Sequence, residues 1–225
     1  MNNIVNLMRY TTFVFIAAVS CYFVVRDAVP VLTFTGERYA TFELDVIIVF
    51  LHVLGGFLAL FIGPLQFSSR LRKRYPIWHR SAGKVYVYSI FLAAPISFYL
   101  LLDFGGVQFA LPTFIFGFLW LLNTLVAFLL AVKKRFLLHF QFMVRSYALT
   151  FAFVSVRTVW PLLEFLGIID SATAEDPGDF LFITREWGML VITILVPEVW
   201  FIWRYQLRSI FVRNKTMQAD IKSYA

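Results

Sequence analysis

The chain has 225 residues, of which 60% are hydrophobic and 15% are charged, and its formal net charge is +7. A soluble domain of this length does not carry so much apolar and so little charged sequence, so the composition excludes a soluble globular protein. Most of the positive charge lies beside apolar segments, which favours anionic lipid headgroups over nucleic acid as its partner.

Apolar segments long enough to cross a membrane recur along the whole chain. A bilayer core of about 30 Å requires roughly 20 apolar residues in a helix. Six segments meet this requirement, at about residues 10–33, 44–67, 82–102, 109–132, 138–166 and 187–203. The first holds the single cysteine, Cys21, so a disulfide within the chain is excluded. The sequence predicts an all-α membrane protein, a bundle of six transmembrane helices in a single domain over residues 1–225.

Basic and acidic residues alternate between successive connections. The connections after the second and fourth segments and the tail after the sixth are basic, whereas the other connections hold most of the acidic residues, including the long loop 167–186. The positive-inside rule then places both termini and the basic loops in the cytoplasm, beside anionic headgroups.

Three of the charged residues inside the apolar segments stand out: Arg145 and Arg157 in the fifth and Glu198 in the sixth. Arg145 comes six residues after His139 and Glu198 comes six residues before Arg204. Both therefore lie roughly 9 Å below the cytoplasmic surface, and we expect them to form an ion pair. This pair could clamp the two helices together or belong to a proton or ligand path.

Arg157 lies in the outer half of the fifth segment, and the sequence leaves three candidate partners for it. Glu164 follows it on the same helical face, and Asp45 or His52 could approach it from the second segment.

The three histidines lie at two different depths. His79 and His139 both lie near the cytoplasmic face, and two imidazoles at one level could ligate a haem iron, as in haem b. Arg80 and Arg145 could then pair with the haem propionates. The alternative is that both histidines touch lipid phosphates or cap helix ends. His52 lies deeper, as a hydrogen-bonded core residue or a lone polar site.

Small residues recur on one face of the second segment, at Gly55, Gly56, Ala59 and Gly63. Such a stripe is typical of helix contacts in membranes, here within the chain or, as a second interpretation, between two copies. The sequence holds no zinc-ligand cluster, phosphate-binding loop or nucleophile elbow, and it therefore favours a non-enzymatic role.

Three stretches together resemble the signature of a bacterial membrane-protein family. They are His52-x-x-Gly55-Gly56…Gly63-Pro64-x-Gln66-Phe67, His79-Arg80-x-x-Gly83-x-x-Tyr86 and His139-x-x-x-Met143-x-Arg145-Ser146-Tyr147-Ala148-Leu149…Arg157, and Glu198 fits the same pattern. The family is called domain of unknown function, number 2306, and the resemblance spans about residues 46–203. It implies a helical domain of the bacterial inner membrane with these polar positions as its candidate site. It supplies no activity. The run Phe140-Gln141-Phe142 departs from the pattern, where we expect a Trp near Met143.

Two functions remain open from the sequence. The first is a membrane-complex subunit, homo-oligomer or small-ligand binder, with haem or a quinone headgroup held at His79, Arg80, His139, Arg145 and Glu198. The second is a proton or small-solute transporter, in which His52, Arg157, Arg145 and Glu198 form a polar column between helices.

Overall fold

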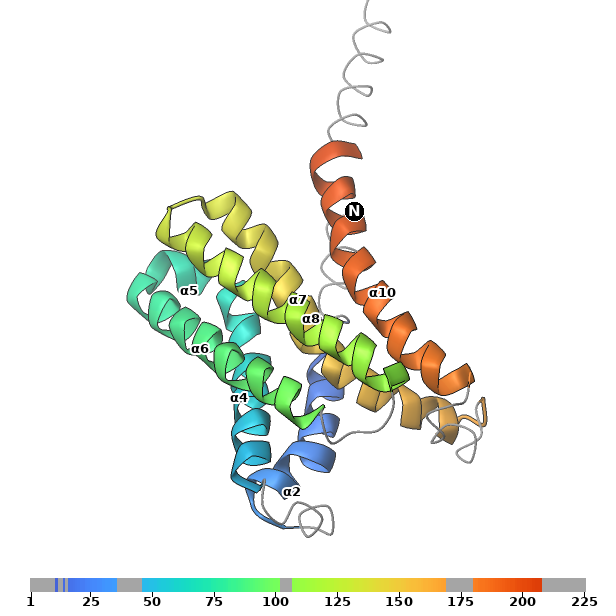
Figure 1. Cartoon of the computed structure of the whole chain (residues 1–225). Coiled ribbons are helices and arrows are strands. Elements are labelled where there is room, and N and C mark those ends of the chain that lie inside the picture. Colours follow the sequence, from blue (N-terminus) through green and yellow to red (C-terminus); the bar gives the residue numbers. More distant parts are fainter. Residues whose placement is uncertain are drawn as a thin grey trace, which may run out of the picture.

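The computed structural model describes residues 11, 14, 16–35, 46–101, 107–168 and 180–207, and every regular element among them is helical (Figure 1). Five of these helices are long and apolar enough to cross a membrane. They are α4 (Val46–Gln66), α6 (Pro76–Leu100), α7 (Val107–Val132), α8 (Phe136–Phe165) and α10 (Phe180–Ile202). The all-α membrane architecture is confirmed for this part of the chain.

The first predicted span is described only in part. Residues 16–23 are α-helical and continue into η1 (Val24–Ala28), which has π-helical hydrogen bonds, and α2 (Val29–Leu32). Residues 1–10, Asp45 and residues 169–179 lie outside the described residues. The sixth crossing and the cytoplasmic placement of both termini therefore stay predictions.

The basic connection after the second span is helical, which differs from the predicted loop. Ser68 accepts a hydrogen bond from the Leu71 amide at 3.2 Å and so caps the short helix α5 (Ser69–Arg74). Helix α6 then begins at Pro76, where the absent amide proton costs nothing, rather than at residue 82. Helix α10 likewise begins at Phe180 rather than at residue 187.

Helices α4, α6, α7 and α8 pack together as a central group. Helix α4 packs on α6, α6 on α7 and α7 on α8, while α4 also touches α8. Helix α10 packs against α8 and α7, along one side of the group (Figure 1). Helix α5 and the turn between α7 and α8 lie at the same end of the molecule, so two of the basic connections are brought together.

The small residues of α4 allow its close approach to neighbouring helices. A Cβ atom at Gly55 would lie 2.7 Å from the Ser89 carbonyl oxygen of α6, and one at Gly63 would overlap the ring of Tyr147 of α8. Gly56, in contrast, meets no atom within 4 Å. The predicted small-residue contact within the chain is confirmed at Gly55 and Gly63.

A hydroxyl network joins α6, α7 and α8 at the centre of the core. The Tyr86 hydroxyl lies 2.8 Å from Ser146 Oγ and 3.2 Å from Thr150 Oγ1. Ser146 Oγ lies 2.7 Å from Thr124 Oγ1, and the Trp120 indole donates to Thr150 Oγ1 at 2.9 Å. All five side chains are buried. Buried polar groups with complete hydrogen bonding fix one arrangement of the helices.

Candidate functional site

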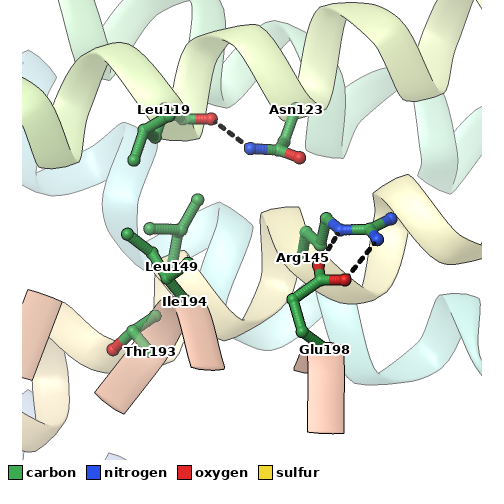
Figure 2. Close-up of a pocket in the computed structure, with 7 residues that line it drawn as sticks. All are labelled: Leu119, Asn123, Arg145, Leu149, Thr193, Ile194 and Glu198. Carbon is green, nitrogen blue, oxygen red and sulfur yellow. Dashed lines mark hydrogen bonds and ion pairs between the residues drawn. The ribbon is translucent and has the colours of Figure 1, made fainter. Parts of the chain in front are cut away.

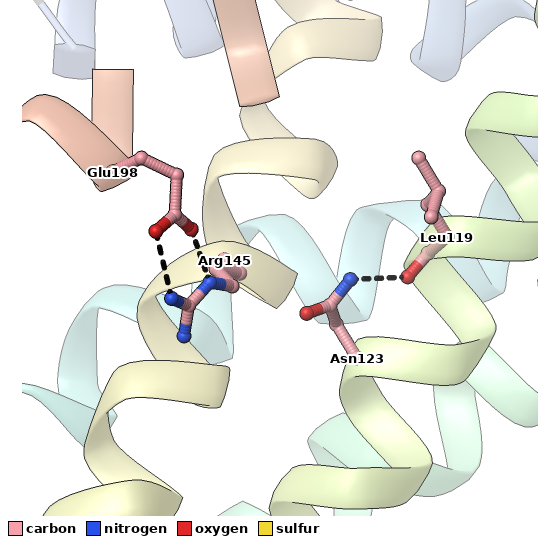
Figure 3. A network of polar contacts seen from close by, with 4 residues as sticks. All are labelled: Leu119, Asn123, Arg145 and Glu198. Atoms are coloured by element: carbon pink, nitrogen blue, oxygen red, sulfur yellow. Dashed lines mark hydrogen bonds and ion pairs between the residues drawn. The ribbon is translucent and has the colours of Figure 1, made fainter. Parts of the chain in front are cut away.

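Arg145 of α8 and Glu198 of α10 form the predicted ion pair. Arg145 Nε donates to Glu198 Oε1 at 2.5 Å and Nη2 donates to Oε2 at 3.0 Å (Figure 3). This bidentate geometry, with two parallel hydrogen bonds, is the strong form of an arginine–carboxylate ion pair. The side chains are 24% and 41% exposed, so the pair lies at the edge of the helix contact rather than in its centre.

Aromatic rings complete the surroundings of Arg145. Its guanidinium carbon lies 5.1 Å from the ring centre of Phe142 and 4.8 Å from that of Phe201. Ring faces carry negative potential, so both rings stabilise the cation inside an apolar region.

A cavity of about 80 Å³ opens beside this pair, between α7, α8 and α10 (Figure 2). Seven residues line it: Leu119, Asn123, Arg145, Leu149, Thr193, Ile194 and Glu198. The Asn123 amide nitrogen donates to the Leu119 carbonyl oxygen at 2.8 Å, and its side-chain oxygen points toward the side where Arg145 lies (Figure 3). The cavity therefore has a polar end and an opposite end that is mainly apolar.

His79 and His139 lie near each other at the basic end of the bundle, where their rings interact electrostatically. His139 Nδ1 lies 2.8 Å from the Ala127 carbonyl oxygen of α7. A carbonyl oxygen can only accept, so Nδ1 carries a proton, and the neutral form of the ring has its lone pair at Nε2. The Nδ1 atom of His79 is buried without a hydrogen-bond partner among the described residues.

The two polar groups at this depth are separate. His139 contacts α7, whereas Arg145, six residues later on α8, contacts α10. Six residues rotate a helix by about 240° and advance it by about 9 Å. The five residues expected to share one cytoplasmic-half site are therefore divided between a histidine cluster and the Arg145–Glu198 cavity. Arg80 is exposed beside the histidine cluster.

In the outer half, His52 is a hydrogen-bonded core residue, as one of its two interpretations predicted. Its Nδ1 lies 2.9 Å from the Ala93 carbonyl oxygen of α6. Arg157 interacts electrostatically with His52 and lies over the Phe23 ring at 6.0 Å. Within the described part, Arg157 and Glu164 form no ion pair, and Asp45 lies outside it.

The two arginines of the predicted polar column lie at separate levels of α8. Arg145 and Arg157 are 12 residues apart, about 18 Å along the helix. Between them α8 buries Leu149, Ala152 and Val154, each 3% exposed. The same interval also buries Ser146 and Thr150 of the hydroxyl network, and it contains no charged residue.

The family model described as Predicted membrane protein (DUF2306) matches residues 49–201, more than half of the chain. The chain belongs to this family. The comparison with curated proteins and the comparison with solved structures gave no match. In this member of the DUF2306 family, the matched segment contains the cavity, both histidine levels and the Arg145–Glu198 pair.

Of two further functional candidates in this DUF2306 protein, Asn123 was missed in the sequence, whereas Gln66 was indicated only as a polar position of the family pattern. Asn123 is the single asparagine of the fourth apolar segment, and this isolation was the signal that could have indicated it. Gln66 is 7% exposed and its Nε2 atom has no hydrogen-bond partner among the described residues. Among those residues, no group of three or more His, Cys, Asp and Glu is placed to hold a metal ion.

Proposed function

We propose that this protein binds a small ligand in the membrane, and that the ligand is the headgroup of a quinone in the cavity between α7, α8 and α10. The observation that carries the proposal is the division of the cavity. Arg145, Glu198 and Asn123 line one end, and Leu119, Leu149 and Ile194 line the other (Figure 2). Binding sites for small molecules combine apolar walls with a few placed polar groups.

A quinone headgroup matches both ends. Its flat ring contacts the leucine and isoleucine side chains, and its carbonyl oxygens accept hydrogen bonds. The guanidinium of Arg145 has five N–H donors, of which two hold Glu198, so donors remain for the ligand. The Asn123 side-chain oxygen accepts from a hydroxyl, so the site suits the reduced ligand as well.

The position of the cavity suits a ligand that arrives from the bilayer. Ile194 lines it and is also 41% exposed on the outer face of α10. An isoprenoid tail can leave along this face into lipid. The volume of about 80 Å³ admits a single ring, whereas pockets for larger ligands run from roughly 300 Å³.

Quinone titration of the purified protein in lipid nanodiscs tests the proposal, with tryptophan fluorescence as the readout. Asn123→Leu should weaken binding of a short-chain benzoquinol about tenfold, because it removes the acceptor for a ligand hydroxyl, and Glu198→Gln should do the same, because Arg145 loses the carboxylate that orients it. Leu129→Ala, at a lipid-exposed position of α7, should bind like the wild type. Binding equal to that of empty nanodiscs, or unchanged in both cavity variants, would refute the proposal.

The visible absorption spectrum of the same preparation tests the haem interpretation. The free Nε2 lone pair of His139 and its closeness to His79 support that interpretation. A Soret band lost together in His79→Ala and His139→Ala would assign haem to the histidine cluster. In that case redox chemistry would centre there rather than in the cavity.

A further inference from the structure

Two buried polar atoms without a partner lie at the basic end of α4 and α6. Gln66, the last residue of α4, is 7% exposed, and its Nε2 atom has no partner among the described residues. The same holds for the buried Nδ1 atom of His79, in the first turn of α6. Buried polar atoms are nearly always hydrogen-bonded, so Gln66 Nε2 indicates a missing acceptor, and His79 Nδ1 requires one as well in the tautomer that carries its proton.

Gln66 packs against α6 at Gly83, one helical turn beyond His79. A Cβ atom at Gly83 would lie 3.1 Å from Gln66 Oε1, so the amide of Gln66 rests against the backbone of α6. His79 precedes Gly83 by four residues, which places it one turn away on the same helical face. The oxygen of Gln66 therefore faces the helix, and the donor end of its amide remains for a ligand.

The charge around the two polar atoms selects an anion. The electrostatic neighbours of His79 are Arg72, Arg80 and His139. The sequence has no acidic residue between Asp45 and Asp103. The first turn of α6 adds the positive end of the helix dipole. An acceptor that enters this field is therefore negatively charged.

Exposed apolar side chains beside the two polar atoms indicate that the anion belongs to a lipid. Ile77 and Trp78 directly precede His79 and are 74% and 70% exposed, and Tyr75 is 47% exposed. Aromatic side chains of this kind lie at the level of lipid headgroups. Basic pockets between transmembrane helices bind phosphate-bearing headgroups.

We propose that Gln66 and His79 hold the phosphate of an anionic phospholipid, with Arg72 and Arg80 neutralising its charge. Phosphate oxygens accept from the Gln66 amide, from His79 when Nδ1 carries a proton, and from guanidinium groups. The acyl chains lie along the apolar face at the start of α6. This site is independent of the quinone cavity, which is lined by residues of α7, α8 and α10.

Lipid titration of the purified protein in neutral detergent tests the site, with the melting temperature as the readout. Phosphatidylglycerol should raise the melting temperature saturably, whereas phosphatidylcholine and inorganic phosphate at equal concentration should not. Gln66→Leu should melt at or above the wild-type temperature without lipid, because it removes an unsatisfied buried donor, and should lose the lipid-dependent rise. If Gln66 had only a structural role, Gln66→Leu would lower the melting temperature without lipid and keep the lipid-dependent rise.

Two surface variants repeat the test without touching the core. Arg72→Gln should weaken the apparent affinity for phosphatidylglycerol about tenfold, because it removes a charge-assisted contact. Arg70→Gln removes the same charge from α5 at a residue outside the neighbourhood of His79 and should change it little. Equal effects of the two variants, or a full lipid response in Gln66→Leu, would overturn the site. An equal response to inorganic phosphate would overturn the lipid as the source of the anion.

Discussion

Tyr86 has one hydroxyl proton. The two oxygens within its reach, Ser146 Oγ and Thr150 Oγ1, both donate their own protons to other acceptors. Thr124 donates to the Trp120 carbonyl oxygen and Thr150 donates to the Ser146 carbonyl oxygen. Ser146 must therefore donate to Thr124, and Tyr86 must donate to Ser146 or Thr150. Because every proton of the network already has an acceptor, the network has a structural role and does not need a ligand.

Removing the Tyr86 hydroxyl should destabilise the protein without changing its surface. Tyr86→Phe should lower the free energy of unfolding by about 1 kcal/mol, the usual value of one buried hydrogen bond. Tyr88→Phe is the matched control, since Tyr88 is 60% exposed on the same helix. Denaturant unfolding in detergent micelles measures both. Equal stability of the two variants would contradict the described hydrogen bonding.

The candidate site was predictable from the sequence where residues are charged. A full charge inside an apolar segment needs a partner, and the fixed rise of a helix gave Arg145 and Glu198 the same depth. Asn123 and Gln66 carry no charge, so they did not stand out among neutral residues. His139 and Arg145 belong to separate sites because they lie on different sides of α8, one facing α7 and the other facing α10. Depth alone does not contain that information.

At the scale of helices, contact between α4 and α6 depends on missing side-chain atoms. Beside Gly55, a Cβ atom would lie 2.7 Å from a carbonyl oxygen of α6 and 2.9 Å from Ala93 Cβ. Close backbone approach of this kind drives helix association in membranes, because lipid offers little hydrophobic difference between helix and solvent.

Two adjacent glycines of α4 should respond oppositely to the same change. Gly55→Ala should cost about 1–3 kcal/mol of unfolding free energy, because the added methyl group forces the helices apart. Gly56→Ala adds a methyl group where no atom lies within 4 Å, and its better helix propensity should leave stability unchanged or raise it by up to about 1 kcal/mol. Denaturant unfolding distinguishes them, and a more stable Gly55→Ala protein would contradict this packing.

The sequence predicted the existence of these helices but not all of their ends. Hydropathy reports which residues lie in the hydrocarbon region, and a helix can continue into the headgroup region. Pro76 and the capping Ser68 start α6 and α5 there, at positions that polar composition had indicated as loop. Which helices are neighbours, such as α10 beside α7 and α8, depends on side-chain packing. Hydropathy does not predict it.

For the whole molecule, the described part fixes five membrane-length helices, and the number of crossings depends on the N-terminal segment. Six crossings place the N-terminus on the same side as the basic turn between α7 and α8, whereas five place it opposite. The sorting of charge along the chain favours six.

Labelling of single cysteines with a membrane-impermeant maleimide measures this number. In a Cys21→Ser background, a cysteine at Ile168 should react in intact cells, because Ile168 follows α8 and is 64% exposed. Cysteines at Lys134 and at Asn3 should react only after permeabilisation. The background protein itself should not react. Labelling at Asn3 from outside would mean that the N-terminal segment does not cross the membrane.

The contacts of Arg145 also have an order in time. Helix α8 is synthesised before α10, so Arg145 leaves the ribosome before Glu198 and Phe201 do. During that interval Phe142, one turn earlier on the same helix, is the ring that the guanidinium can already reach. The last helix then enters with a carboxylate whose partner is already in place. The contacts with Glu198 and Phe201 are therefore the last that Arg145 can form.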